Sequence, residues 1–426
     1  MGPPISPNLS FDASLVSVLF FPQRIVLRLD GSDYSPPVLE RIVAVGGEFS
    51  SFAIAAKLFA RLTDLVIAER TINNKTIQIG SEMAEARAAM TAVHLARPIT
   101  APPKVAEPAV SLAVAQVDGG RMQTRTIGRG SGVHDPHWRE SKNAGLYRMI
   151  GQTFTEDPHP ELPSCFTSPK QMATLLHGTA ELSPTQDILA DKPDLSWRPK
   201  SLVRTCVSSL CDSDRFGEMM SAEAEHRGFY SADRRAFLGD GLSYNWKIQQ
   251  THFETFTPIL DFIHPIERLH ELSRVLFDDA DEAWRECGKW IELVWQGDVN
   301  EVIGILEAEQ QSRAPADPTS DENDPGRKLA ETLGYLRNNV SRMRYPAYRT
   351  AGLPTTSCLI ESQVKEINHR VKGTEKFWND GESGDAILHL RAALISDGDQ
   401  LADHMAARPG RHYTRESKKD RQLAMT

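Results

Sequence analysis

Two aspartates stand where predicted strands end, and a glutamate stands within a predicted helix. Asp118 follows an apolar run over 109–117, Asp240 follows a run over 235–238, and Glu361 lies within the stretch TTSCLIESQVKEINHRVKGTEKFW. In open α/β sheets, sites form at the carboxyl ends of strands. Mg²⁺ prefers oxygen ligands, and two such ions can activate an attacking oxygen and stabilise a leaving one. We therefore predict a phosphoryl-transfer site at these three residues that uses two Mg²⁺ or Mn²⁺ ions.

Each acid has a simpler interpretation when it is taken alone. Asp118-Gly-Gly is typical of a hairpin turn, and Gly-Asp-Gly around Asp240 is typical of a loop. Asp261 ends the next predicted strand, over 257–260, and competes with Asp240 for the place of the second acid. It could also cap a helix that begins near Pro265. His264 alone would more often be a partly buried histidine than a functional one.

The N-terminal part of the chain is predicted to be helical over 51–84. A turn at 64–68 separates two helices, and the second is expected over Glu69–Gly80. Four side chains on its polar face are of the types that contact phosphates and base edges. They are Arg70, Asn73, Asn74 and Lys75. The pair resembles a helix-turn-helix, although an ordinary helical hairpin would look similar.

A proline-rich linker over 97–108 precedes the predicted α/β core. Strands are expected at 109–117 and 121–127, joined by the turn at Asp118-Gly-Gly, and at 144–153, 235–238 and 257–260. Helices are expected at 201–227, 244–250, 264–309 and 329–343. The fold class is therefore α/β, with a sheet flanked by helices.

The overall net charge of −9 disfavours a protein that coats nucleic acid with its whole surface. Residues 334–372 carry seven basic and two acidic residues, a local surplus of 7 minus 2, or +5. Lys365, Asn368 and Lys372 share a face of the predicted glutamate helix and could hold phosphates. The basic tail over 408–426 is either a phosphate-binding arm or a disordered end. No apolar run is long enough to span a membrane, and no secretory signal opens the chain, so a cytoplasmic location is expected.

The chain resembles bacterial insertion-sequence transposases with a DDE-type, RNase H-like core. The resemblance covers roughly residues 35–410. Its most specific stretches are YSADRRAFLGDGLSYNWKIQQTHF, ILDFIHPIERL, ETLGYLRNNVSRMRYPAYRTAGLPTTSCLIESQVKEINHRVKGTEKFW and AILHLRAALIS. It implies a catalytic, metal-binding triad of Asp118, Asp240 and Glu361. It also implies that Asp261 and His264 match a DxxH element that supports the site without binding the catalytic metal.

The resemblance implies the following domain organisation. An N-terminal helical region over 1–96, which binds the DNA ends, is followed by the linker over 97–108. The RNase H-like core, a mixed sheet flanked by helices, occupies 109–264 and 346–407. An all-α insertion over 265–345 interrupts it, and the basic tail over 408–426 ends the chain.

The implied activity is metal-dependent cleavage and strand transfer at the ends of an insertion sequence. The partners would be double-stranded DNA, as terminal inverted repeats and target, and at least a second copy of the chain on that DNA. The expected location is the bacterial cytoplasm, at the nucleoid. Lys365, Asn368, Arg370 and Lys372 would contact DNA beside the acids, as would Arg70, Asn73, Asn74 and Lys75 in the N-terminal region. Two alternatives stay open: a catalytically dead, transposase-derived DNA-binding regulator, and a nuclease on the same core without strand transfer. A carboxylate-pair glycosidase would explain neither the basic helix nor the third acid.

Overall fold

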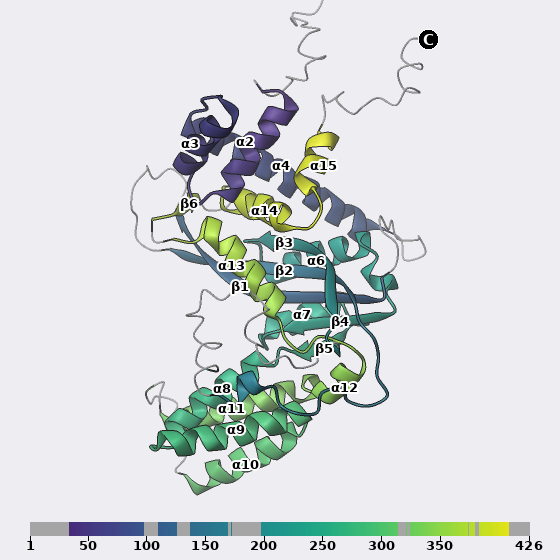
Figure 1. Ribbon diagram of the computed structural model, residues 1–426, viewed down its shortest axis with the longest axis vertical. Helices are drawn as coiled ribbons and strands as arrows, with labels where there is room; N and C mark the ends of the chain where they lie inside the picture. Colours follow the sequence, from purple (N-terminus) through teal and green to yellow (C-terminus); the bar gives the residue numbers. More distant parts are fainter. Residues whose placement is uncertain are drawn as a thin grey trace, which may run out of the picture.

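A six-stranded sheet lies between two groups of helices in the computed structural model (Figure 1). The structure describes residues 34–97, 110–125, 137–168, 172, 197–313, 321, 324–373, 375–379 and 383–408. The predicted linker beyond Arg97 and the basic tail beyond Arg408 lie outside these residues, as does the end of the strand predicted over 121–127. The observed α/β class, with a mixed sheet flanked by helices, agrees with the sequence prediction.

The sheet combines antiparallel and parallel pairing in the order β3-β2-β1-β4-β5, and β6 also pairs with β1. Strands β1, β2 and β3 are antiparallel neighbours, whereas β4, β5 and β6 run parallel to the strands that they pair with. The strands are β1 (Leu112–Arg125), β2 (Trp138–Ile150), β3 (Lys200–Ser209), β4 (Arg234–Gly239), β5 (Thr257–Leu260) and β6 (Phe377–Asn379).

The hairpin predicted at Asp118-Gly-Gly is wrong, because β1 runs straight through these residues. Gly119 pairs with Lys142 and Gly120 with Ser141, and the register with β2 is unbroken. The helix predicted over 201–227 is also wrong in its first half. That half is strand β3, and only α6 (Ser213–His226) is helical. Pairing along β2 decides the conformation of both segments.

The upper helical group joins the N-terminal helices to the end of the chain. It consists of α2 (Pro36–Glu48), α3 (Phe52–Thr63), α4 (Glu69–Ala96), α14 (Ser383–Ile395) and α15 (Gln400–Ala407) (Figure 1). Helix α4 is longer than the predicted Glu69–Gly80 and packs along α14. A Cβ atom at Gly80 would lie 2.3 Å from the backbone oxygen of Ala386, so glycine allows this close contact.

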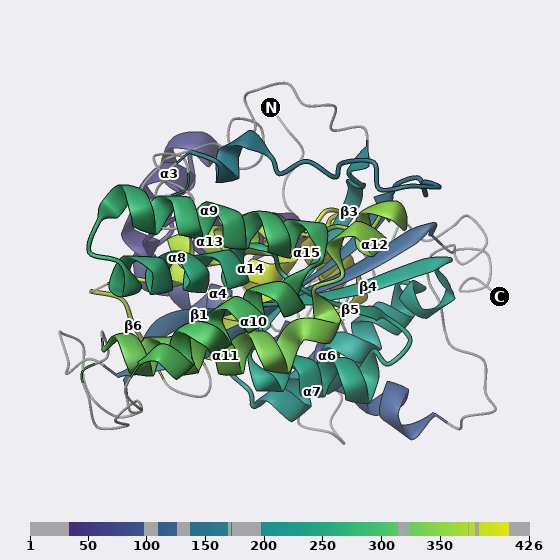
Figure 2. The ribbon, with the colours of Figure 1, turned by 90° about the horizontal axis from the view of Figure 1, so that it is seen from below.

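The lower group lies between β5 and α13 in the sequence, and all of the regular elements described there are helices (Figure 2). Its members are α8 (Ile263–Leu276), α9 (Ala280–Gln296), α10 (Val299–Ser312) and α11 (Pro325–Asn339). Arg349, in the following helix α12 (Tyr345–Thr350), is fully buried and connects this group to the loop after β2, which contains Asp157. Its Nε donates to Asp157 at 2.8 Å, and its guanidinium lies 4.0 Å from the ring centre of Trp295. The ion pair holds the pKa of Asp157 below its usual value despite the opposing effect of burial.

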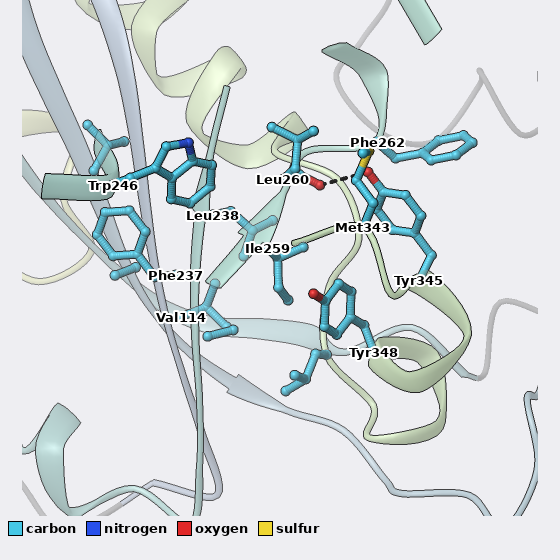
Figure 3. Close-up of a cluster of buried hydrophobic side chains, with 14 of the residues drawn as sticks. Val114, Phe237, Leu238, Trp246, Ile259, Leu260, Phe262, Met343, Tyr345 and Tyr348 are labelled. Carbon is cyan, nitrogen blue, oxygen red and sulfur yellow. Dashed lines mark hydrogen bonds between the residues drawn. The ribbon is translucent and has the colours of Figure 1, made fainter. Parts of the chain in front are cut away.

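The sheet and the lower helices share one hydrophobic core, part of which is drawn in Figure 3. Leu238 of β4 and Ile259 of β5 are fully buried there, and the hydroxyl of Tyr345 donates to the carbonyl oxygen of Leu260 at 3.1 Å. This packing fixes the ends of β4 and β5, where Asp240 and Asp261 follow. None of the helices in the described ranges is long and apolar enough to cross a membrane.

Candidate active site

Three aspartates follow one another across three adjacent parallel strands: Asp118 lies within β1, Asp240 follows β4, and Asp261 follows β5. β1 and β4 are in register up to Gln116 opposite Leu238, so two residues further Asp118 comes beside Asp240. β4 and β5 are in register up to Gly239 opposite Leu260, and the amide of Asp261 donates to the carbonyl oxygen of Gly239 at 3.0 Å. Asp261 therefore follows Asp240 in the same row.

Glu361 joins this row from α13 (Cys358–Val371), where it occupies the first turn. Two side chains of the sheet hold that turn. The Asp261 carboxylate accepts from the amide of Ser357 at 2.9 Å, and the Gln116 side chain accepts from the amide of Ile360 at 3.1 Å. The Ser357 hydroxyl in turn donates to the Glu361 carboxylate at 3.3 Å. We refer to Asp118, Asp240, Asp261 and Glu361 as the acid cluster.

The charges of the acid cluster act on one another. Burial, together with the charges of Asp240 and Glu361, raises the pKa of Asp118 to about 6, against the opposing hydrogen bond from the amide of Gly119. Burial and the charge of Asp261 raise the pKa of Glu361. Like charges that are held together and shielded from water disfavour ionisation. A bound cation would offset that repulsion.

Asp261 and His264 form a pair behind the other acids. Asp261 is fully buried, and burial raises its pKa despite the nearby His264. The Nε2 atom of His264 lies 3.5 Å from Asp261 Oδ2. Burial disfavours the imidazolium, but its hydrogen bond with Glu267 and the charges of Asp261 and Asp240 raise the pKa of His264 to about 9. His264 is therefore cationic at neutral pH, at the edge of the acid cluster.

Several residues that the sequence pattern does not indicate fix the position of Asp240. The Asp240 carboxylate accepts from the amide of Leu242 at 2.9 Å and from the side chain of Asn245 at 2.8 Å. The hydroxyl of Tyr335, on α11, donates to the backbone oxygen of Asp240 at 2.9 Å. The contact from Tyr335 links the lower helices directly to Asp240.

A polar pair lies on the face of β1 opposite to Asp118. Tyr244 donates to Glu140 at 3.2 Å, and a Cβ atom at Gly119 would lie 3.4 Å from that carboxylate. Because side chains alternate along a strand, Glu140 lies on the face of β1 opposite to Asp118 and is not part of the acid cluster.

Several buried polar atoms around the acid cluster have no hydrogen-bond partner among the residues that the structure describes. They are Gln116 Nε2, Ser141 Oγ, Asn245 Oδ1, Asp261 Oδ2 and Asn368 Oδ1. Such atoms call for an unseen water, ion or ligand. The donor set of carboxylate, amide and hydroxyl oxygens suits a hard divalent cation. As the side chains stand, however, no three His, Cys, Asp or Glu residues in the described ranges form a group that could hold a metal ion.

The residues predicted to bind DNA on α13 separate onto two faces. Lys365 and Lys372 are exposed and Asn368 is half-buried, on the same helical face as Glu361. Arg370 is only 2% exposed, and its Nε donates to the backbone oxygen of Gly46 in α2 at 2.9 Å. The expectation that Arg370 shares the phosphate-facing surface of Lys365 and Lys372 is therefore corrected. It lies half a helical turn away from that surface.

The residues predicted to bind DNA on α4 lie near its beginning. Arg70 and Asn74 are exposed, whereas Asn73 and Lys75 are half-buried. Lys75 donates to the side chain of Gln78 at 3.2 Å. The structure does not bring these four residues to the acid cluster. Asn73 and Asn74 instead line a separate pocket together with Arg370.

No protein-family model and no curated protein sequence matches this chain. The assignment of function consequently depends on the residues and their geometry.

The raised pKa of Asp118 predicts a pH-dependent effect on stability. Its carboxyl binds more protons in the folded than in the unfolded protein, so its contribution to stability falls as pH rises from 3.8 to about 6. We expect Asp118→Asn, which cannot ionise, to be more stable than the wild type by a margin that grows by about 1 kcal/mol between pH 5 and pH 8. Urea unfolding in the presence of a chelator measures this margin.

The matched control is Asp278→Asn, which removes an exposed aspartate far along the chain from the acid cluster. Its margin should not change with pH over the same range. A margin for Asp118→Asn that is equally independent of pH would contradict the inferred repulsion.

Proposed function

We propose that this chain is a transposase that cleaves DNA at the ends of an insertion sequence and joins them to a target. The observation that carries the proposal is the acid cluster. Asp118 lies within β1, two residues past the end of its pairing with β4, Asp240 follows β4, and Glu361 lies beside them on the first turn of α13. The RNase H-like character of the core, the treatment of α8–α11 as an insertion and the location at the nucleoid are parts of the same proposal.

In this proposal Asp118, Asp240 and Glu361 hold two Mg²⁺ or Mn²⁺ ions. When bound, such ions activate an attacking oxygen and stabilise a leaving one. Asp261 and Gln116 position Glu361 by fixing the first turn of α13. The cationic His264 lies where it can donate to a phosphate oxygen, and Lys365 and Lys372 face the DNA backbone.

The proposed reaction has two steps at the same site. Water first attacks the phosphorus at the end of the element, the bond to the 3′-oxygen breaks, and a 3′-hydroxyl and a 5′-phosphate result. That hydroxyl then attacks a phosphodiester of the target, so that one P–O bond replaces another and no energy source is needed. Because both ends must join one target, we propose that at least two copies act together on double-stranded DNA.

The experiment uses the full chain and a supercoiled plasmid that carries the genomic DNA on both sides of the coding region. We expect nicks at the terminal inverted repeats with Mg²⁺ or Mn²⁺, and joined products when target DNA is added. A chelator should abolish both. Nicks without joined products would favour a nuclease, and binding to the repeats without nicks would favour a regulator. Either outcome would overturn the proposal.

A further inference from the structure

A pocket of about 640 Å³ lies at the junction between the N-terminal helices and the sheet. The beginnings of α3 and α4 form one side, and the ends of β1 and α13 together with β6 form the other. It lies outside the acid cluster. It contains Asn73, Asn74 and Arg370, three residues whose types suggested DNA contact but which the structure separates from the acids.

Arg370 gives the pocket a fixed cation. Its guanidinium lies 4.5 Å from the ring centre of Phe52 and 5.0 Å from that of Trp378. Its Nη2 atom is buried and has no hydrogen-bond partner within the described ranges. Burial, with a smaller effect of Arg391, lowers the pKa of Arg370 to about 10. A buried guanidinium with an unused donor calls for an anionic oxygen.

The other charges of the lining balance one another, so its net charge comes from Arg370. Arg125 and Lys376 add two cations, against the acids Glu69 and Glu375, so the lining carries a net charge of 3 minus 2, or +1. Lys376 donates to the backbone oxygens of His369 and Arg370, at 3.0 and 3.2 Å. Burial and the charge of Arg370 lower the pKa of Lys376. Together the cations suit a phosphate group.

Aromatic and amide side chains complete the pocket. Phe52 and Phe377 are half-buried and offer surfaces on which a base can stack, whereas Trp378 is only 7% exposed. Asn73 and Asn74 offer donors and acceptors of the kind that read base edges. Phosphate, stacking surface and amide groups in one pocket of this size match the parts of a single nucleotide.

The distance between the pocket and the acid cluster corresponds to a few nucleotides of a DNA strand. Along α13, Arg370 is nine residues from Glu361, or about 14 Å at the helical rise. Along β1, Arg125 is seven residues from Asp118, or about 23 Å at the rise of a strand. With a spacing of about 3.4 Å per nucleotide, these lengths correspond to roughly four to seven nucleotides.

We propose that this pocket binds one nucleotide of the DNA strand, roughly four to seven nucleotides from the phosphate at the acid cluster. The spacing depends on the proposed function, because it assumes that DNA occupies the acid cluster. The binding of a DNA nucleotide in the pocket does not require that the acids be catalytic.

Photocross-linking tests the proposal with the full chain and a short single-stranded oligo(dT) that contains one 5-iodo-deoxyuridine. We expect the cross-link on the tryptic peptide that begins with Phe377 and contains Trp378. Asn74 is exposed and lines the pocket. The nearly isosteric substitution Asn74→Asp places a negative charge in the lining, so it should lower the cross-link yield about fivefold. Asn300→Asp, an exposed asparagine of α10, is the matched control and should leave the yield unchanged.

Cross-links confined to other peptides, or an Asn74→Asp yield equal to that of Asn300→Asp, would overturn the proposal. So would tighter binding of free deoxynucleoside monophosphates than of the oligonucleotide, because the ligand would then be a free nucleotide. If the plasmid is not cut but the cross-link behaves as expected, the proposed function fails and the pocket stands. If the plasmid is cut and the cross-link is absent, the opposite holds.

Discussion

Glu361→Gln and Asp118→Asn should each lower the rate of metal-dependent DNA cleavage by about a thousandfold or more. Each change removes one negative charge from the acid cluster and leaves a side chain of nearly the same shape. The carboxamide oxygen that replaces the Glu361 carboxylate can still accept the hydrogen bond of Ser357, and the one that replaces the Asp118 carboxylate can still accept that of the Gly119 amide. The fold should therefore persist, and DNA binding should stay within about twofold of the wild type because the exposed lysines of α13 are unchanged.

The measurement is the initial rate of plasmid nicking, with DNA affinity and the circular dichroism spectrum determined for the same preparations. Asp278→Asn serves as the control and should cut at the wild-type rate. Nicking by either amide variant at a rate near that of the wild type would remove that residue from the metal site.

Asp240→Asn and Asp261→Asn should differ from each other, which decides between the two candidates for the second acid. Asp240 is partly exposed, and both hydrogen bonds that its carboxylate accepts can be kept by asparagine. We expect its variant to lose cleavage about a thousandfold without loss of stability. Asp261 is fully buried beside a charged His264, so its variant should be less stable by about 2 kcal/mol. Because Asp261 acts by positioning Glu361, its variant should retain roughly one-tenth to one-hundredth of the activity.

Magnesium titration separates the two roles further. Asp261→Asn should reach half of its maximal rate at a Mg²⁺ concentration close to that of the wild type, because the residue acts through α13. If Asp240→Asn cuts normally and Asp261→Asn does not cut at all, the second acid is Asp261.

The local sequence pattern was sufficient to predict the strands β4 and β5. β4 (Arg234–Gly239) contains the predicted 235–238, and β5 occupies the predicted 257–260. It failed at the middle of β1, where a turn was predicted, and for β3, because the conformation of both depends on pairing with β2 rather than on local propensity. The two glycines after Asp118 suggested a turn, whereas the paired neighbour keeps them extended.

The acids could be found from the sequence, but their supports could not. Gln116 and the amide of Ile360 are 244 residues apart in the chain, and no local pattern connects them. The position of Arg370 on the face of α13 opposite to Glu361 could be predicted from the sequence. Nine residues at about 100° per residue place it half a turn from Glu361. Its burial under α2 follows from that geometry, although the identity of the covering helix does not.

Helix α13 is secured at both ends by parts of the chain that are distant in sequence. Gln116 and Asp261 hold its first turn. At its last turn, Arg370 donates to the carbonyl oxygen of Gly46, and the indole nitrogen of Trp378 donates to the carbonyl oxygen of Val371 at 3.0 Å. Removal of the N-terminal helices would therefore remove the hydrogen bond between Arg370 and Gly46, one of the contacts that hold the helix carrying Glu361. Loss of activity in such a truncated protein would not by itself reveal a role in recognising DNA, since the deletion would misalign the glutamate as well.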